Sequence, residues 1–393
     1  MVVKGWLVLL ALGVVAVSGS WRGVAAQGAW GGGTKTCVAP ATAAFQPTTT
    51  SGSLAAIAPI SPHDVWAVGS VCYGSRLQTL AEHWDGLRWR VIPDPTLPAA
   101  ARRLSGVAAV TTNDVWTVGP QDEGLGDRGV LIEHWDGRGW RVVPGARSPG
   151  AEATLLGIAA VARDDVWAVG TLAGMASRTL VEHWDGRIWR TVASPSPGPS
   201  VLFGVAAPSA HDVWAVGFSE DGAGRPAPLA EHWDGLRWRV VPSRDSGYRG
   251  SMLVAVASYP GASVWAVGQQ GDGSTPLIER WDGARWRLVP SPWPGSTDGF
   301  LSGVAALSAS DAWAVGPGSG DAGHAALAEH WNGRLWREIA VPNPGPATRL
   351  AAVTMLSHGD AWAVGEGGPG PWGAAIEHWN GRRWCVVTIA QCR

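Results

Sequence analysis

From residue 54 onwards, short apolar runs alternate with Gly, Pro and Asp-Gly, and the same four runs recur in a fixed order. The first is small and apolar, as in Leu-Ser-Gly-Val-Ala-Ala at 104–109. The second is Asp-Val-Trp-Ala-Val-Gly (64–69), the third ends in Glu-His-Trp (82–84), and the fourth is Trp-Arg-Val-Val-Pro (140–144). Short runs rich in Val and Trp and bounded by turn residues are typical of β-strands. The pattern therefore predicts four strands, A to D, in each unit.

This unit of about 50 residues occurs seven times. The copies lie near 54–103, 104–153, 154–200, 201–250, 251–299, 300–348 and 349–393. Four strands in each of several consecutive repeats are typical of a β-propeller, in which every blade is an antiparallel sheet. We predict an all-β, seven-bladed propeller over 54–393, with four antiparallel strands per blade and no helix longer than about two turns.

Tryptophan follows the repeat, because three per copy in seven copies make 21 of the 26 tryptophans. Side chains alternate between the two faces of a strand, so Trp66 in strand B and Trp84 in strand C are expected on opposite faces of their blade. Each blade would press one indole against each neighbour, which predicts core packing rather than ligand stacking. Asp85-Gly86 predicts a tight turn between strands C and D.

The first 26 residues have the pattern of a secretory signal peptide. Lys4 precedes an apolar run from Trp6 to Val17, and Val24-Ala25-Ala26 follows, which matches a basic segment, a short hydrophobic segment and a cleavage site. The run is shorter than the ~20 residues that cross a bilayer, and an uncleaved anchor stays open as the alternative. We expect residues 27–53 to be a Gly/Thr-rich tail that can add an edge strand near Cys37, and the mature chain to be extracellular.

The charge distribution argues against a polyanionic partner. The formal net charge is −2, and Lys4 and Lys35 are the only lysines. The arginines recur at one repeat position and alternate with Asp and Glu, which is not the basic stripe that nucleic acid or an anionic membrane requires. We therefore expect no nucleic-acid binding, and no membrane contact after signal cleavage.

Asp and His recur together at fixed places in strands B and C. The predicted pairs are Asp64 with His83, Asp114 with His134, Asp165 with His183, Asp212 with His232, Asp311 with His330, and Asp360 with His378. In the fifth copy both are replaced, by Ser263 and Arg280. Positions on adjacent antiparallel strands can face each other, and seven equivalent sites around a ring cannot converge on one substrate atom. We therefore predict structural hydrogen-bonded pairs rather than a general base and its orienting carboxylate.

The remaining inventory does not match the propeller enzymes that we considered. A copper radical oxidase would need tyrosine ligands and a crosslinked cysteine, whereas Tyr73, Tyr248 and Tyr259 fall in inter-strand loops and the cysteines lie near the termini. A sialidase would need a tyrosine nucleophile, an acid and an arginine cluster at the ring centre. No metal-ligand or phosphate-loop motif is present. We expect no catalytic residue, cofactor or metal.

Long, variable B–C and D–A links are the predicted binding surface, because variable loops on a rigid scaffold usually carry binding. In an A-B-C-D meander these links emerge on one face. The candidate contact residues are the non-repeated aromatics Tyr73, Phe218, Tyr248, Trp293 and Trp372. For each of them, capping of the adjacent blade is the open alternative.

Four cysteines in an exported chain suggest two disulfides, and the sequence alone leaves three pairings. Cys37-Val38-Ala39-Pro40 is similar to the strand D pattern, and Cys385 replaces the arginine of the other strands D. We predict Cys37–Cys385 and Cys72–Cys392 across the seam between the first and last blades. Local pairing, Cys37–Cys72 with Cys385–Cys392, is the open alternative.

The units over 54 to about 388 resemble those of secreted bacterial propellers related to Kelch and Asp-box (BNR-like) proteins. The Asp-x-Trp-Ala-Val-Gly and Asp-Gly-x-x-Trp motifs are also similar to those of photosystem II assembly-factor propellers. The Kelch Gly-Gly pair is absent, and only the Asp-Gly-x-x-Trp part of the Asp-box is met. Because these groups include lectin-like, enzymatic and assembly proteins, the resemblance implies a blade, not an activity. We expect a secreted binding scaffold for a glycan or protein; the alternatives are an extracellular glycoside hydrolase or oxidase, or an assembly protein without a small ligand.

Overall fold

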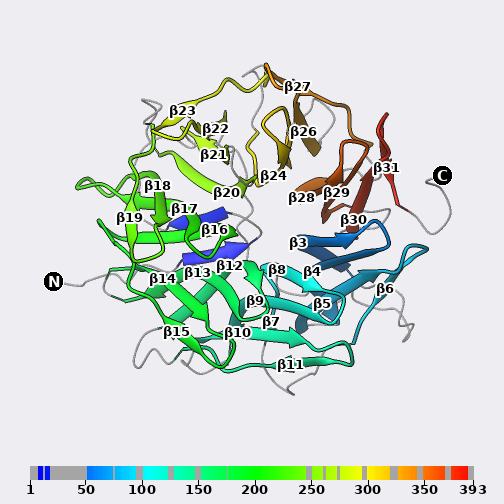
Figure 1. Cartoon of the computed structure of the whole chain (residues 1–393), viewed down its shortest axis with the longest axis horizontal. Coiled ribbons are helices and arrows are strands. Elements are labelled where there is room, and N and C mark those ends of the chain that lie inside the picture. Colours follow the sequence, from blue (N-terminus) through cyan, green and yellow to red (C-terminus); the bar gives the residue numbers. More distant parts are fainter. Residues whose placement is uncertain are drawn as a thin grey trace, which may run out of the picture.

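The computed structural model is a ring of seven four-stranded antiparallel sheets (Figure 1), which confirms the predicted propeller. It describes residues 8–11, 14–17, 51–73, 76–93, 101–122, 128–146, 152–174, 176–244, 250–259, 263–271, 275–293, 299–318, 326–342, 348–367 and 373–387. These residues contain strands and turns but no helix. Within the predicted signal segment, β1 (Val8–Ala11) and β2 (Val14–Val17) pair with each other.

Each blade contributes its strands in the order A, B, C, D from the axis outwards. The A strands are β3 (Ser51–Ser61), β8 (Gly106–Thr111), β12 (Glu152–Ala162), β16 (Ser200–Ser209), β20 (Met252–Ser258), β24 (Gly303–Ser308) and β28 (Arg349–Ser357). In blade two the short β7 (Ala101–Arg102) also pairs with strand B, ahead of β8. The B strands are β4 (Asp64–Tyr73), β9 (Asp114–Asp122), β13 (Asp165–Ala173), β17 (Asp212–Glu220), β21 (Val264–Gln270), β25 (Asp311–Pro317) and β29 (Asp360–Glu366).

The two outer positions of each blade belong to strands C and D. The C strands are β5 (Arg76–Trp84), β10 (Arg128–Trp135), β14 (Arg178–Trp184), β18 (Pro226–Trp233), β22 (Thr275–Trp281), β26 (Ala326–Trp331) and β30 (Ala374–Trp379). The D strands are β6 (Trp89–Val91), β11 (Trp140–Val142), β15 (Trp189–Thr191), β19 (Trp238–Val240), β23 (Trp286–Leu288), β27 (Trp336–Glu338) and β31 (Trp384–Val386). The D strands have three residues each, which keeps the exposed sheet edges short.

The glycine that ends the Trp-Ala-Val-Gly motif is required by the close approach of strands A and B. A Cβ atom on Gly217 would lie 1.9 Å from the carbonyl oxygen of Val201, and the equivalent atom on Gly69 would lie 1.9 Å from that of Ser53. Every described blade has this contact, at 1.9–2.1 Å. No other residue fits there, because a Cβ atom essentially never comes within 3.0 Å of a backbone atom.

The tryptophans hold neighbouring blades together as the alternation predicts. Trp66 is opposite His83 in the register, whereas Trp84 is opposite Val65, so the two indoles lie on opposite faces of the blade. The strand B indole of each blade meets the strand C and strand D indoles of the next, and the strand D indole stands edge-on at 4.9–5.6 Å between centroids. Edge-to-face aromatic pairs of this spacing are favourable beyond their buried area.

The A–B and C–D turns lie at one end of every blade, which we call the turn face; the B–C and D–A links lie at the other, the loop face. The C–D turn has four residues rather than the two of a tight hairpin. In blade one the Asp85 amide donates to the Arg88 carbonyl, and the Asp85 carboxylate accepts from the Leu87 and Arg88 amides. Gly86 takes a φ of 85°, which favours glycine at this point.

Among the described residues, blades one and seven close the ring without exchanging a strand. Blade one is complete within β3 to β6 and blade seven within β28 to β31. Their contact is an apolar cluster that joins Leu54, Val65 and Leu80 of blade one to Trp362 and Val364 of blade seven. The predicted extra strand near Cys37 lies outside the described residues. In blade one, strand A begins at Ser51, three residues before the predicted boundary.

Candidate functional site

All six Asp–His pairs are hydrogen-bonded within their blades. In each, the His Nε2 atom lies 2.7–2.8 Å from the Asp Oδ1 atom. The histidine ring also packs on the strand B indole, as His83 does on Trp66 with 4.5 Å between centroids. In blades two to four the same carboxylate oxygen accepts the indole N–H, for example from Trp167 to Asp165 at 2.9 Å. Each pair is therefore part of the packing between its own strands B and C.

Blade five keeps this connection with different residues. Arg280 donates from Nε and Nη2 to Ser263 Oγ, at 3.0 and 2.8 Å. Its guanidinium also lies over the Trp265 and Trp331 rings, 5.1 and 5.8 Å from their centroids. The joint replacement of Asp and His thus preserves a hydrogen bond at the same place, and the guanidinium covers the strand B indole that histidine covers elsewhere.

Asp311 in blade six has a second histidine partner. His330 of its own blade binds Oδ1, and Nδ1 of His358, from the A–B turn of blade seven, binds Oδ2. The carboxylate is 1% exposed, whereas His358 is largely exposed. Burial alone would raise the pKa of Asp311, but the hydrogen bonds from His330 and His358 outweigh it, so the pKa is lowered. This side chain links blades six and seven.

The structure adds a ring of buried strand C glutamates that the sequence analysis did not single out. They are Glu82, Glu133, Glu182, Glu231, Glu279, Glu329 and Glu377, and all except Glu82 are fully buried. Each precedes the paired histidine, or Arg280 in blade five, so it faces the preceding blade, while the residue after it faces the following one. The signal was present in the Glu-His-Trp motif, but the partner lies about 36 residues earlier, in the preceding repeat.

The end of strand D in the preceding blade supplies the donors. Ser194, Ser243 and Ser291 donate their hydroxyls to Glu231, Glu279 and Glu329 at 2.5–2.7 Å. Glu182 accepts the Ala146 amide at 3.0 Å. In blade six the position of these serines is taken by Val341, and neither carboxylate oxygen of Glu377 has a hydrogen-bond partner among the described residues.

Burial raises the pKa of these carboxyls, because the charged form loses its hydration. Desolvation is the first cause in each case, and it raises the pKa of Glu82 to about 6 and those of Glu182, Glu231, Glu279 and Glu329 to about 7. The pKa of the unpartnered Glu377 is raised furthest, to about 8. The contacts between blades are therefore linked to proton binding near neutral pH.

The predicted loop aromatics do not form one exposed cluster among the described residues. Phe218 lies within β17, is 2% exposed and packs on Phe203 with 5.9 Å between ring centroids, so it is a core residue and not a loop contact. Tyr73 is in β4, because the B strands continue past the predicted ends. Trp293 is half-buried and packs against the blade five–six core and Gly299. Tyr248 and Trp372 lie outside the described residues.

The loop-face ends of the A strands differ from blade to blade. The residue before the buried leucine is Ser53, Arg103, Thr154, Val201, Met252, Phe300 or Arg349 in blades one to seven. In blades four to six these side chains are buried apolar groups, whereas blades seven, one and two have arginine, serine and arginine. The turn-face ends, in contrast, carry the same hydrogen-bonded Asp–His pair in six of the seven blades. The seven repeats thus differ from one another in sequence at the loop face.

Arg102, on the same segment, is a buried cation with incomplete hydrogen bonding. The residue is 6% exposed, and neither its Nε nor its Nη2 has an acceptor among the described residues. Arg349 likewise lacks an acceptor for Nε, and its Nη1 lies 3.7 Å from Glu366 Oε1. Because a buried donor without an acceptor is costly, these groups are ready to accept an anionic ligand group.

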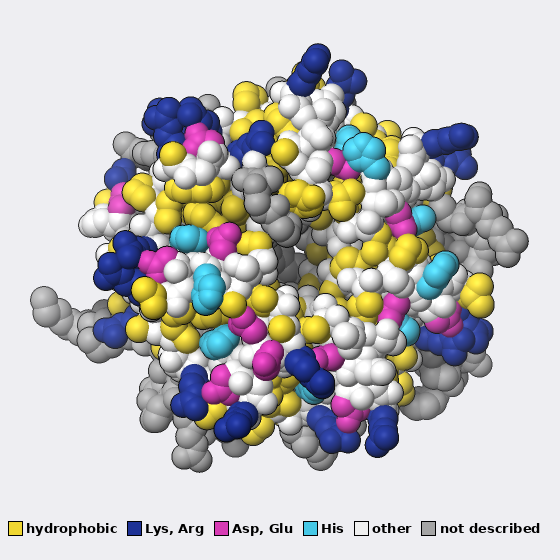
Figure 2. Space-filling view, viewed as in Figure 1, with side chains coloured by type: hydrophobic (Ala, Val, Ile, Leu, Met, Phe, Trp, Pro, Cys, Tyr) yellow, Lys and Arg dark blue, Asp and Glu magenta, His cyan; other side chains and the backbone are white. Residues whose placement is uncertain are grey.

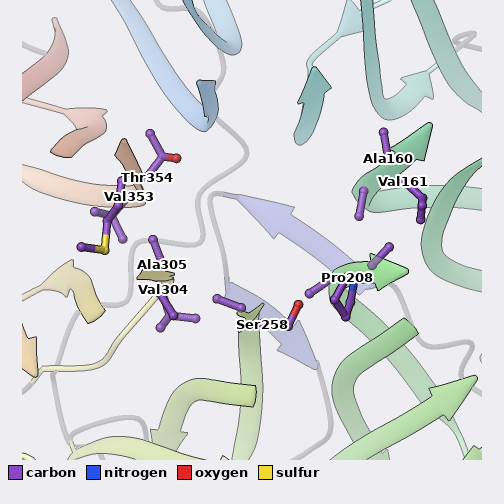
Figure 3. Close-up of a pocket in the computed structure, with 14 residues that line it drawn as sticks. Ala160, Val161, Pro208, Ser258, Val304, Ala305, Val353 and Thr354 are labelled. Atoms are coloured by element: carbon purple, nitrogen blue, oxygen red, sulfur yellow. The ribbon is translucent and has the colours of Figure 1, made fainter. Parts of the chain in front are cut away.

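A cavity of about 510 Å³ occupies the central channel towards the turn face (Figure 3). Its walls are the ends of the A strands of blades three to seven, and the lining is small and apolar, with Ser258 and Thr354 as the hydroxyl groups. No titratable side chain lines it. Within the described part of the chain, no group of three or more His, Cys, Asp or Glu residues has the arrangement of a metal site.

The predicted disulfides are not tested by this structure. Cys72 and Cys385, which lie within the described residues, are not joined to each other. Cys37 and Cys392 lie outside them, so the seam-closing and local pairings both stay open. Nothing among the described residues forms a helix long and apolar enough to cross a membrane.

Comparison with known proteins supports the architecture. No protein-family model matches the sequence, and no curated protein matches it. The fold is similar to YCF48 bound to a D1 peptide, with 15% identity, a TM-score of 0.52, and coverage of 82% of this chain and 93% of that one. It is also similar to the β-propeller domain of the Trilobed protease from Pyrococcus furiosus, described as having an open velcro topology (9% identity, TM-score 0.54, 86% and 98% covered). The chain is a β-propeller.

A third similar structure is the GH74 xyloglucanase from Xanthomonas campestris, at 15% identity and a TM-score of 0.59. That match covers 86% of this chain but only 55% of the xyloglucanase. The similar propellers thus include enzymes as well as a peptide-bound protein, and at this level of identity they establish the fold alone.

Proposed function

We propose that this chain is a secreted, non-catalytic binding protein that recognises a protein segment or a glycan through its loop face. The observation that carries the proposal is the buried Arg102 guanidinium, whose Nε and Nη2 lack acceptors among the described residues. A scaffold that retains such a group usually needs it for something other than stability. The surrounding departures from the repeat, at Arg103 and Arg349, support the same face.

The arginines favour a ligand with a carboxylate, because guanidinium binds carboxylate through paired, charge-assisted hydrogen bonds. A protein segment supplies one from Asp, Glu or its C-terminus, and an acidic glycan supplies one from a uronic acid. The peptide bound to the similar YCF48 propeller favours a protein ligand. The extracellular location is part of the proposal and rests on the signal-like segment at residues 1–26.

The alternative function is an extracellular propeller enzyme, which the similarity to a xyloglucanase keeps open. Its catalytic groups would have to come from outside the repeated Asp–His pairs, because these are consumed by contacts within each blade. An assembly protein without a small ligand is the third possibility. Turnover assays on xyloglucan, aryl glycosides and simple alcohols separate the enzyme from the two binding functions.

The test is an array that carries acidic oligosaccharides and peptides with free C-terminal carboxylates. We expect wild-type protein to bind a subset, and the double substitution Arg103→Ala with Arg349→Ala to weaken that binding at least about tenfold, the usual scale for charged groups at a binding site. Arg225→Ala is the matched control, because Arg225 lies on the same face but in the B–C link of blade four, away from the A strands, where it pairs with Asp221 at 2.6 Å. Equal loss in the control, or binding unchanged in the double variant, would contradict this site.

A further inference from the structure

The tips of the C–D turns combine exposed aliphatic and cationic side chains. In blades one, three, four and six, the two residues that follow the Asp-Gly or Asn-Gly pair are one large aliphatic residue and one arginine. The tip aliphatics are Leu87, Ile188, Leu236 and Leu335, which are 84%, 49%, 86% and 48% exposed. The tip arginines beside them are Arg88, Arg187, Arg237 and Arg334, all exposed.

The fold places these tips together on the rim of the turn face. In six of the blades, all except blade five, the glycine of the C–D turn lies against the A–B turn, as Gly86 does against His63 in blade one and Gly235 against His211 in blade four. The described histidines belong to this end of the blades, and the histidine-bearing face in Figure 2 has arginine side chains gathered around its rim. The turn face therefore presents a ring of such tips in a common orientation.

The tip arginines are free to bind an anion, unlike the strand D arginines below them. Arg90 pairs with Asp85 at 2.6 Å and Arg239 with Asp234 at 2.9 Å, so the acidic group of each turn is already engaged. Amide hydrogen bonds, that of Arg88 first, hold the pKa of Asp85 below its usual range. Among the described residues, no carboxylate forms an ion pair with a tip arginine. Each tip thus carries uncompensated positive charge.

Packing does not require the tip aliphatics. Ala284 occupies the position of Leu87 and Leu236 in blade five, and Gly139 occupies the position of Ile188 and Leu335 in blade two, yet all these blades form the same turn. An aliphatic side chain that is more than four-fifths exposed, as at Leu87 and Leu236, gains nothing from the folded chain. Any burial of such a side chain has to come from another apolar medium.

We propose that the turn face docks on an anionic lipid surface, with the tip aliphatics in the headgroup–acyl boundary and the tip arginines on lipid phosphates. Interfacial binding combines buried apolar area with attraction to anionic lipids in this way, and arginine stems can extend along the boundary while their charge stays at the headgroups. A soluble polyanion would engage the arginines but leave the aliphatics in water. This docking replaces the sequence-based expectation of no membrane contact, and it leaves the loop face open.

The test is sedimentation of the full-length chain with phosphatidylcholine vesicles and with vesicles that also contain phosphatidylglycerol. We expect binding to the anionic vesicles that weakens with added salt, because headgroup attraction is screened. Leu87→Ser with Leu236→Ser, and separately Arg88→Gln with Arg237→Gln, should each reduce the bound-to-free ratio at least about tenfold. Leu288→Ser and Arg141→Gln are the matched controls, since these exposed residues lie on strand D rather than at a turn tip.

Melting temperatures must be equal for all five proteins, since the substituted side chains are exposed. Vesicle binding that is the same in the wild type and both double variants would overturn the proposal, because it would come from elsewhere, including the apolar segment at residues 6–17 that every variant keeps. Binding of dextran sulfate that depends on the tip arginines, without vesicle binding, would also overturn it in favour of a soluble polyanion. Loss of array binding by the loop-face variants bears on the proposed function alone.

Discussion

Aspartate, histidine and tryptophan form one packing unit in each blade, although two of them are the commonest partners in general-base catalysis. The His183 ring packs on Trp167 with 4.2 Å between centroids, and its Nε2 lies 2.8 Å from Asp165. A face of the imidazole ring and its Nε2 atom are therefore both occupied by contacts inside the blade. The repetition of the unit in six blades, with Arg280 and Ser263 in its place in blade five, fits a role in folding rather than in turnover.

We predict that His183→Ala lowers the free energy of unfolding by about 1–3 kcal/mol, because Asp165 loses its ring partner while half-buried. Denaturant unfolding measures this directly. The informative control is the double substitution Asp165→Ser with His183→Arg, which copies blade five and should recover part of the loss. A double variant no more stable than His183→Ala would show that the blade five arrangement is not equivalent.

Glu377 determines how stability responds to pH between blades six and seven. Its carboxyl is buried without a hydrogen-bond partner among the described residues, and desolvation raises its pKa from 4.5 to about 8. Between pH 4.5 and about 8 the folded chain therefore binds more protons than the unfolded chain. The stability that this carboxyl contributes is complete below pH 4.5 and is lost as the pH rises towards 8. Three charged groups of blade six share a face of the sheet with its strand B indole, and that face points towards blade seven. They are Asp311, His330 and Arg337.

We predict that the wild-type melting temperature falls as pH rises from 5 to 8.5, and that Glu377→Gln flattens this dependence. Each pH unit in which only the folded carboxyl is protonated contributes up to about 1.4 kcal/mol. Val341→Ser should shift the dependence to lower pH, because it restores the hydroxyl donor found in blades three to five. Asp164→Asn, at an exposed carboxylate in the A–B turn of blade three, is the control. A wild-type melting temperature that rises over this range would contradict the linkage.

At the scale of the strand, the Trp-Ala-Val-Gly motif is explained by two different constraints. The indole fills the space between blades, and the glycine lets strand A cross within contact distance of strand B. The first constraint is visible in a hydrophobic pattern; the second is a backbone contact at one carbonyl group. Both recur in every blade, which is why one short motif defines the unit.

We predict that Gly217→Ala destabilises the chain by at least about 2 kcal/mol, because its Cβ atom would lie 1.9 Å from the Val201 carbonyl oxygen and the strands would have to separate. Gly222→Ala in the same blade is the matched control, since nothing lies within 4 Å of its Cβ position. Thermal unfolding of the two variants provides the comparison. Equal melting temperatures would show that the strands move apart at no cost.

The repeat predicts the strands well because each is specified by local alternation and turn residues, as in strand B from Asp64 to Gly69. It does not predict contacts between copies. Glu231 looks like a surface residue beside His232 until Ser194 of the preceding blade is placed against it at 2.5 Å. Phe218 looks like a loop residue because the length of strand B depends on pairing with strand A of its own blade. Arg102 could not be found from the sequence, since its burial comes from the neighbouring blade.

At the scale of the whole molecule, the described residues close the seam between blades one and seven through side-chain packing. Trp84 and Trp89 of blade one meet Trp362 of blade seven at 5.2 and 5.5 Å between centroids. Other seams in the ring also have a covalent connection through the chain. This seam is therefore the place where an additional crosslink would stabilise the ring most.

We predict disulfides Cys37–Cys385 and Cys72–Cys392 across this seam. Ser51 is opposite Cys72 in the register, and the fourteen Cα–Cα steps from Cys37 to Ser51 can span up to about 46–50 Å. Closing a loop of this length contributes roughly 4–5 kcal/mol in the chain-entropy model, against about 3 kcal/mol for a short loop. Non-reducing peptide mapping decides the pairing, and a peptide that joins Cys385 to Cys392 would refute it.

The central claim has two parts. The repeated Asp–His pairs stabilise the blades, and the loop face, where the blades differ in sequence, binds the ligand. The most direct measurement compares melting temperature and array binding for Asp165→Asn and for Arg103→Ala with Arg349→Ala. We predict that Asp165→Asn lowers the melting temperature and leaves array binding intact in the folded fraction, whereas the arginine double variant keeps its melting temperature and loses array binding. Loss of array binding by Asp165→Asn at an unchanged melting temperature would contradict the account.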